Sequence, residues 1–253
     1  MNTKIALITG ATSGIGEATT LKLADNGFDV IIIGRRNDRL TTLKEKLEKN
    51  GTRVLSLCLD VRIESEVKSA VENLPDEWKN IDVLVNNAGL VAGLSSLQEG
   101  DTDDWNRMID TNIKGLLYIT RYVSPFMITR EKGHIINIGS IAGKEVYPNG
   151  NVYCATKHAV DALTKGMRMD MLKHNIKVTQ ICPGAVETEF SIVRFYGDKA
   201  RADNVYKGFE SLVAADIADC ILFAVSRPSH VNINDMIVMP AAQATGTLFN
   251  KKL

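Results

Sequence analysis

The sequence predicts an α/β fold, a doubly wound parallel sheet of about seven strands with helices on both faces. Short apolar runs alternate with longer helical patterns throughout the 253 residues. Each run is apolar for most of its length, as a strand covered on both faces should be. No low-complexity linker or repeat interrupts the pattern, so we expect one domain spanning residues 1–253.

The expected strands are, in chain order, residues 5–9, 30–34, 54–58, 83–86, 135–138, 178–182 and 236–239. The segments between them have helical periodicity. In residues 38–50, for example, leucines mark one face and Gly51 supplies a C-terminal stop. Long helices are expected at 103–132 and 151–174. Ligands of such sheets bind beyond the carboxyl ends of the strands, so the residues that follow each strand are where we expect chemistry.

Composition narrows the classes of partner. Lysine plus arginine equals aspartate plus glutamate, 30 of each, so no basic excess points to nucleic acid. No apolar run approaches the ~20 residues needed to cross a bilayer. The four cysteines form no C-x-x-C pair and are expected to be reduced thiols. The short apolar stretch before the first glycine is too short for a secretory signal, so we expect a cytoplasmic protein with a small-molecule substrate.

Directly after the first strand, residues 9–16 read TGATSGIG and lead into a helical run over residues 17–26. Glycines in such a loop let the backbone turn sharply and approach a pyrophosphate, whose charge is met by the amides at the helix N-terminus. This strand, loop and helix predict a Rossmann-like dinucleotide site. The expected contacts are Gly10, Thr12, Ser13, Gly14, Ile15 and Gly16.

The second strand ends in Gly34-Arg35-Arg36, where folds that prefer NAD place an acid for the ribose hydroxyls. Two guanidinium groups there would attract a 2′-phosphate through charge-assisted hydrogen bonds, which favours NADP (NADPH) as the cofactor. The alternative is an exposed basic turn. Loop residues after the third and fourth strands are placed to reach the adenosine end of the cofactor, although each pair or triplet alone is ordinary loop chemistry. These residues are Asp60, Val61, Asn87, Ala88 and Gly89.

Ser140 follows the fifth strand, and Tyr153 and Lys157 lie on the next predicted helix. A spacing of four places tyrosine and lysine on one helical face, one turn apart. A free phenol titrates near ~10, so a neighbouring ammonium is needed to bias it toward the phenolate for proton transfer. Ser140 can hydrogen-bond the reacting oxygen. The alternative is an ordinary i, i+4 pair on a helix.

The same region offers two other chemistries, a metal site and a hydrolase nucleophile. Cys154 and His158 are four apart, a spacing that can ligate a metal, but no second pair accompanies them, so no metal site is expected. Ser140 lacks the G-x-S-x-G elbow of a hydrolase, which leaves it as a hydrogen-bond donor.

Several motifs in this order resemble the short-chain dehydrogenase/reductase family along the whole chain: TGATSGIG, NNAG, Ser140 followed by Tyr153 and Lys157, and Pro183-Gly184. The resemblance implies that Asn112 holds a water that links Lys157 to solvent. It also implies that Pro183, Gly184, Val186 and Thr188 lie at the nicotinamide, and that the chain forms a homotetramer through the two long helices.

Within that family, the sequence is most similar to the NADP-dependent 3-hydroxy acid dehydrogenases, which act on serine, L-allo-threonine, 3-hydroxyisobutyrate or malonic semialdehyde. The resemblance lies in residues 74–78, 108–112, 150–153, 188–195 and 230–234. It implies a substrate lid at about 187–212. We expect Arg194 to bind the acid group of the substrate; the alternative is a surface pair with Asp198. Ser140, Asn149 and Tyr153 complete the expected substrate contacts.

Other functions stay open on the sequence alone. Related enzymes reduce sulfoacetaldehyde or 3-oxoacyl esters of an acidic carrier protein, and some relatives are dinucleotide-sensing regulators without catalysis. A regulator should have lost the tyrosine or the lysine, whereas Tyr153 and Lys157 are both present.

Overall fold

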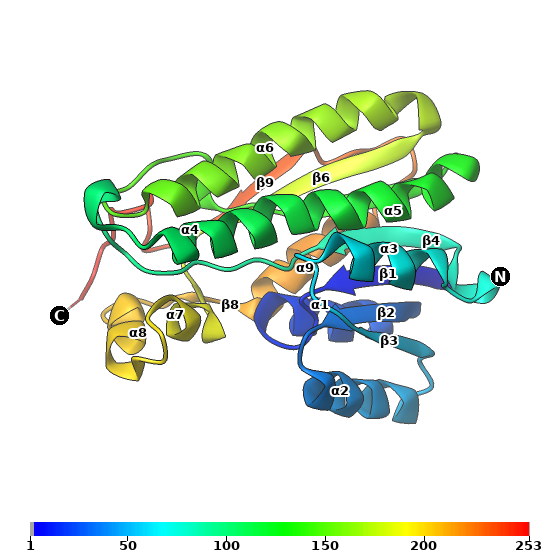
Figure 1. Cartoon of the computed structure of the whole chain (residues 1–253), viewed down its shortest axis with the longest axis horizontal. Coiled ribbons are helices and arrows are strands. Elements are labelled where there is room, and N and C mark those ends of the chain that lie inside the picture. Colours follow the sequence, from blue (N-terminus) through cyan, green and yellow to red (C-terminus); the bar gives the residue numbers. More distant parts are fainter. Residues whose placement is uncertain (1–2, 253) are drawn as a thin grey trace.

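A computed structural model describes residues 3–252 and shows one seven-stranded parallel sheet with strand order β3-β2-β1-β4-β5-β6-β9 (Figure 1). The strands are β1 (Lys4–Thr9), β2 (Phe28–Gly34), β3 (Val54–Cys58), β4 (Ile81–Asn86), β5 (Gly133–Ile138), β6 (Ile176–Pro183) and β9 (Asp235–Val238). Each predicted strand is present, and most begin one or two residues earlier than the apolar run suggests. The doubly wound prediction is therefore confirmed.

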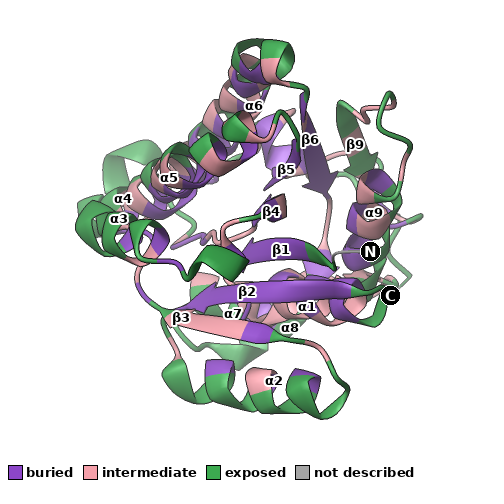
Figure 2. Cartoon of the chain, turned by 90° about the vertical axis from the view of Figure 1, so that its right-hand side faces the viewer, coloured by how far each residue is buried: buried purple, intermediate pink, exposed green. Residues whose placement is uncertain are grey.

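Helices cover both faces of the sheet. On one face α3 (Glu64–Glu72), α5 (Leu116–Thr129) and α6 (Asn151–Met171) pack on the odd-numbered core residues of β1 and β2. On the other face lie α1 (Gly14–Asp25), α2 (Asn37–Lys49) and α9 (Ala214–Val225). Figure 2 shows β2 and β6 buried between helices whose outer sides are exposed. Burial of both strand faces explains why the strands are continuously apolar.

The long helix predicted at 103–132 is not one α-helix, which corrects the sequence interpretation. It consists of α4 (Thr102–Ile109), a π-helical stretch η3 (Asp110–Gly115) and α5, and it ends at Thr129. The apolar periodicity continues through the π turn, so the sequence pattern does not reveal it. π turns are rare and are frequent at functional sites, and this one contains Asn112.

The segment predicted as a lid carries two short helices, α7 (Glu189–Arg194) and α8 (Lys199–Tyr206). They are flanked by the two-stranded parallel pair β7 (Val186–Glu187) and β8 (Leu212–Val213). The C-terminal segment returns to the same end of the molecule (Figure 1). There the amide of Lys252 donates to the carbonyl of Gly208 at 2.8 Å, so the tail packs against the end of the lid.

Short 3-10 turns complete the described chain: η1 (Asp76–Trp78), η2 (Leu97–Glu99), η4 (Ile141–Gly143) and η5 (Leu172–His174). Within residues 3–252, no helix is both long and apolar enough to pass through a bilayer.

Candidate active site

A cavity of about 650 Å³ opens at the carboxyl ends of the parallel strands. Segments that follow β1, β2, β4, β5 and β6 all contribute to its lining, as expected for a doubly wound sheet. Every residue that the sequence predicted as a cofactor contact lines this cavity except Gly16. Asn112 lies beneath the surface of the cavity, and Asn149 lies in a neighbouring one.

The glycine loop lies at the bottom of the cavity and leaves no room for side chains. A Cβ on Gly16 would lie 2.2 Å from the Gly10 carbonyl oxygen, so Gly16 acts through loop packing. Gly10 and Gly14 have φ of +67° and +54°, which L side chains rarely adopt. The N-cap residue of α1, Ser13, makes no side-chain cap hydrogen bond, so the first amides of this 12-residue helix are available to an anion. This local structure fits a pyrophosphate.

The loop after β4 holds the glycine loop in place. The Asn87 Nδ2 donates to the carbonyl oxygens of Thr9 at 2.9 Å and Gly10 at 3.3 Å, and the Thr9 hydroxyl accepts from the amide of Ala88 at 2.9 Å. Gly89 lies against Lys157, because a Cβ there would be 3.7 Å from the Lys157 Nζ. The loop therefore connects the glycine loop with Lys157.

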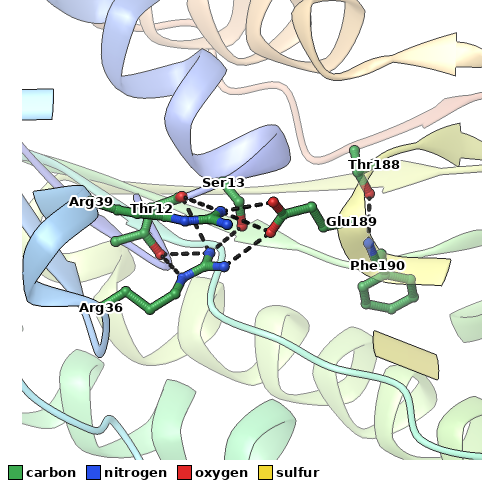
Figure 3. Close-up of polar contacts among 7 residues, drawn as sticks. All are labelled: Thr12, Ser13, Arg36, Arg39, Thr188, Glu189 and Phe190. Atoms are coloured by element: carbon green, nitrogen blue, oxygen red, sulfur yellow. Dashed lines mark hydrogen bonds and ion pairs between the residues drawn. The ribbon is translucent and has the colours of Figure 1, made fainter. Parts of the chain in front are cut away.

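The two arginines after β2 differ in their contacts. Arg36 donates to the Ser13 Oγ at 2.7 Å and to the Thr12 Oγ1 at 2.9 Å, and its Nη1 lies 3.0 Å from a Glu189 carboxylate oxygen (Figure 3). The Arg35 side chain is 60% exposed, and its Nη1 is 3.9 Å from Asp60. Both guanidinium groups are at the rim of the cavity, where the 2′-phosphate of a dinucleotide bound in the glycine loop would lie.

Tyr153 and Lys157 lie one turn apart on α6, and both are buried. The Lys157 Nζ is 6.0 Å from the centroid of the Tyr153 ring and donates to the Ile138 carbonyl at 2.9 Å. Ser140 follows β5, where its Oγ accepts from the amide of Ala142 at 3.1 Å. Burial raises the pKa of Tyr153, and the Ser140 side chain beside the phenol lowers it by a smaller amount. The three side chains therefore meet at one point of the cavity.

The electrostatics of the pair differ from the sequence expectation. Burial raises the pKa of Tyr153, whereas the sequence interpretation had the lysine lower it. Burial also lowers the pKa of Lys157 from 10.5 to about 8. Removing water from both groups penalises the charged form of each, and a spacing of four in the sequence cannot reveal this cost.

The Asn112 side chain is fully engaged with protein groups. Its Nδ2 donates to the Leu90 carbonyl at 2.9 Å and the Thr156 Oγ1 at 3.0 Å, and its Oδ1 accepts from the Leu90 amide at 2.8 Å. Asn112 thus joins the π turn, the loop after β4 and α6. Both Nδ2 hydrogens are used, so a water held by Asn112 would bind its backbone or the remaining lone pair of Oδ1.

Arg194 extends from α7 toward the catalytic residues. Its guanidinium lies 5.7 Å from the centroid of the Tyr147 ring, with Nη2 3.4 Å from the Tyr147 hydroxyl. In the part of the chain that the structure describes, no carboxylate lies within ion-pair distance of Arg194. Asp198 instead accepts from the backbone amide of Arg201, so the predicted alternative of a surface pair with Asp198 is not observed.

A second cavity of about 180 Å³ lies next to the first, and Asn149, Tyr153 and Arg194 all line it. Asn149 has φ of +63°, a left-handed conformation that asparagine tolerates better than most residues. Three of the four expected substrate residues are therefore brought together here, although they come from separate segments of the chain, and the fourth, Ser140, lines the larger cavity.

The residues at the nicotinamide end follow β6 and reach the lid. Val186 is in β7, and the Thr188 side chain caps α7 by accepting from the Phe190 amide at 3.3 Å. A Cβ on Gly184 would lie 2.5 Å from the Gln243 Oε1, so a side chain there would displace Gln243.

Sequence reasoning missed several lining residues. Phe190 lies with its ring centroid 5.9 Å from that of Tyr153, and Phe249 brings the C-terminal tail into the cavity. Glu189 was also missed, although it contacts Arg36. Phe190 is an aromatic residue two positions after Thr188, which is a usable sequence signal that it lines the cavity. The C-terminal tail has no periodic pattern that predicts such a contact.

Cys154 and His158, which have a spacing that can ligate a metal, lie one turn apart on α6. The His158 Nδ1 is 2.9 Å from the Cys154 backbone oxygen, which is an ordinary contact one helical turn apart. Throughout residues 3–252, no three His, Cys, Asp or Glu side chains are grouped so as to hold a metal ion.

The chain is similar to several known proteins. The family model described as short chain dehydrogenase matches residues 4–195. The NADP-dependent 3-hydroxy acid dehydrogenase YdfG of Salmonella typhi is 46% identical over 241 residues, which cover 95% of this chain and 96% of that protein. Sulfoacetaldehyde reductase 2 of Chromohalobacter salexigens is 44% identical over 95% of this chain and 95% of its own length.

Solved structures have the same fold. The closed form of serine dehydrogenase complexed with NADP⁺ superimposes with a TM-score of 0.93 at 43% identity, over 98% of this chain and 100% of that one. A metagenomic short-chain oxidoreductase in complex with NADP gives a TM-score of 0.80 at 25% identity, over 95% and 98% of the two chains.

Proposed function

This chain belongs to the short-chain dehydrogenase family, and on that premise we propose that it transfers a hydride between NADP and the hydroxyl-bearing carbon of a small 3-hydroxy acid. Serine, L-allo-threonine, 3-hydroxyisobutyrate and malonic semialdehyde represent the substrate class. One observation supports this most strongly. The Tyr153 phenol and the Arg194 guanidinium, which has no carboxylate partner among residues 3–252, line the same two cavities.

The residues at the cofactor end fit NADP. The α1 amides and the glycine loop would hold the pyrophosphate, and Arg35 and Arg36 would hold the 2′-phosphate. Val186 and Thr188 would lie at the carboxamide of the nicotinamide. When bound, NADP accepts or supplies the hydride; the chain's own residues handle the proton and the orientation of the substrate.

Tyr153 is the proton-transfer group in this proposal. In oxidation, the substrate hydroxyl gives its proton to the Tyr153 oxygen as the carbon loses a hydride; in reduction, the phenol returns a proton to the carbonyl oxygen. Burial favours the neutral phenol, which suits the reductive direction. Ser140 positions the reacting oxygen, and the Lys157 ammonium stabilises the phenolate whenever the proton leaves. A proton relay through Asn112 would use its backbone or the second lone pair of Oδ1, because its Nδ2 hydrogens are both engaged.

Arg194 is the residue proposed to bind the acid group. A guanidinium can bind a carboxylate with two parallel hydrogen bonds, and its position on α7 couples that contact to the lid at about 187–212. Asn149 adds a polar group to the lining of the smaller cavity.

A second candidate is a small sulfonate such as sulfoacetaldehyde. An arginine binds a sulfonate through the same donors, and the Chromohalobacter relative carries this activity in its name. A carrier-protein ester fits less well, because the net charge is zero. A regulator without catalysis fits least, since Ser140, Tyr153 and Lys157 meet in the cavity.

We further propose one domain, a cytoplasmic location and a homotetramer. All four cysteines are free thiols, which suits a reducing compartment. The outer sides of α5, α6 and η5 expose Leu117, Met169 and Leu172, apolar residues that an interface through these helices would cover.

The test is a substrate panel on the purified protein. NADP⁺ reduction would be followed with serine, L-allo-threonine, 3-hydroxyisobutyrate and 3-hydroxypropionate, and NADPH oxidation with malonic semialdehyde and sulfoacetaldehyde. We expect turnover with at least one 3-hydroxy acid and much slower, though measurable, turnover with the matching alcohols that lack the acid group. Equal turnover of the neutral alcohols would refute the acid-binding role.

A further inference from the structure

The first residue of α7 contacts two arginines that follow β2, Arg36 and Arg39. Glu189, the first residue of α7, lies 3.0 Å from the Arg36 Nη1 (Figure 3). The Arg39 Nη1 donates to both oxygens of the same carboxylate, at 2.8 and 3.0 Å. Glu189 and Arg36 are 153 residues apart in the sequence and both line the cavity.

Each nitrogen of the Arg36 guanidinium already donates to a protein oxygen. Nε and Nη2 face the Thr12 and Ser13 hydroxyls, and Nη1 faces Glu189. A phosphate that binds Arg36 through two parallel hydrogen bonds must therefore replace some of these acceptors.

The three acceptors respond differently to a phosphate. The hydroxyls of Thr12 and Ser13 can rotate and donate a hydrogen bond to it, whereas an ionised carboxylate only accepts. Glu189 is ionised at neutral pH, because hydrogen bonds from Arg39 and then Arg36 lower its pKa despite partial burial. A second anion beside it would be repelled, so Glu189 is the group in direct competition with a phosphate.

We propose that Glu189 is a cofactor-selectivity residue: its carboxylate competes with the 2′-phosphate of NADP for the guanidinium of Arg36. This rests on the proposed role of Arg35 and Arg36 in binding that phosphate. NADH has no 2′-phosphate, so the competition acts on NADPH and not on NADH. Glu189 thereby reduces the preference for NADPH below what the arginines alone would give.

The size of the effect follows from exposure. The side chains of Glu189, Arg36 and Arg39 are 43%, 39% and 42% exposed, so each ion pair is partly screened by water. Pairs of this kind contribute little individually, so Glu189 should modulate NADPH affinity rather than block it. The pair with Arg39 gives the displaced carboxylate an alternative partner.

The experiment measures Kd for NADPH and NADH by calorimetry in the wild type, Glu189→Gln and Glu187→Gln. Glu187→Gln is the matched control, because it removes the same charge two residues earlier in the chain. The Glu187 carboxylate contacts the Ser211 hydroxyl at 3.0 Å. We expect Glu189→Gln to tighten NADPH binding by roughly three- to tenfold and to leave NADH binding unchanged. Glu187→Gln should leave the ratio of the two Kd values at its wild-type level.

Three results would overturn the proposal. An unchanged NADPH Kd in Glu189→Gln shows that there is no competition. Equal tightening of both cofactors shows a general charge effect, and weaker binding of both shows that Glu189 holds the dinucleotide in place. In each case, a wild-type preference for NADPH over NADH would still support the role of Arg35 and Arg36 in binding the 2′-phosphate. If the wild type shows no such preference, both that role and the competition by Glu189 are refuted.

Discussion

The Nζ of Lys157 donates a hydrogen bond to the backbone carbonyl of Ile138 at 2.9 Å. This contact joins the middle of the catalytic helix α6 to the last residue of β5, two residues before Ser140. It fixes the lysine at the point where the sheet ends and the cavity begins. The residue is only 7% exposed, and this burial lowers the pKa of Lys157 to about 8.

Lys157→Met should stabilise the protein at neutral pH. The folded-state pKa of about 8 lies below the ordinary 10.5, so burying the ammonium costs about 3 kcal/mol below pH 8. That cost fades as the pH rises from about 8 to 10.5, and wild-type stability should rise across this window relative to the variant. Urea unfolding should show a gain of about 1–3 kcal/mol at neutral pH, with loss of activity.

Lys165→Met is the control for that gain, because Lys165 lies on the same helix with its side chain 59% exposed. Lys165→Met should not raise the free energy of unfolding by an amount comparable to that of Lys157→Met. If Lys157→Met is less stable than the wild type at neutral pH, burial of the ammonium does not reduce the free energy of unfolding.

Arg194→Ala should raise KM for an acidic substrate by roughly ten- to hundredfold, because a charge-assisted hydrogen-bonding partner is lost. KM for a neutral alcohol should change little. Arg201→Ala controls for disturbance of the lid, since Arg201 stacks on Phe195 with its Cζ 4.5 Å from the ring centroid. Steady-state kinetics that show equal losses for acidic and neutral substrates would assign Arg194 a purely structural role.

Much of the fold follows from the sequence because its causes are local. Burial on both faces makes the strands apolar runs, and the glycines near the end of β1 are needed within a single loop. The same locality predicts Tyr153 and Lys157, which are one helical turn apart.

Other features depend on contacts between distant segments. The Glu189 contact with Arg36 requires the lid to fold across the cavity, and no spacing in the sequence indicates it. The π turn at Asn112 keeps a helical apolar pattern, so it looks like an uninterrupted helix. The raised pKa of Tyr153 comes from the loss of water around the phenol, which only the assembled cavity produces.

Acid should destabilise the protein through His134. This buried histidine of β5 has a pKa lowered by burial to about 3, against 6.5 in the unfolded chain. Below pH 6.5 the unfolded state binds a proton that the folded state does not, so stability falls with pH down to about 3. Between pH 6.5 and pH 5, His134 alone should lower the free energy of unfolding by about 2 kcal/mol.

Urea unfolding of the wild type and His134→Gln over this range checks the histidine directly. Glutamine has no group that titrates there and can still reach the Thr179 hydroxyl, which is 2.7 Å from the His134 Nε2. The variant should lose about 2 kcal/mol less than the wild type over the same range. Parallel curves for the two proteins would show that His134 is not the acid-sensitive group.

The most direct measurement of the central claim compares wild type and Tyr153→Phe for NADPH affinity and for turnover of a 3-hydroxy acid. The phenylalanine ring keeps the packing against Phe190 and removes only the oxygen that carries the proton. We predict NADPH binding within about twofold of wild type and turnover reduced by at least about 10²-fold. Turnover close to wild type with the oxygen absent would contradict the account.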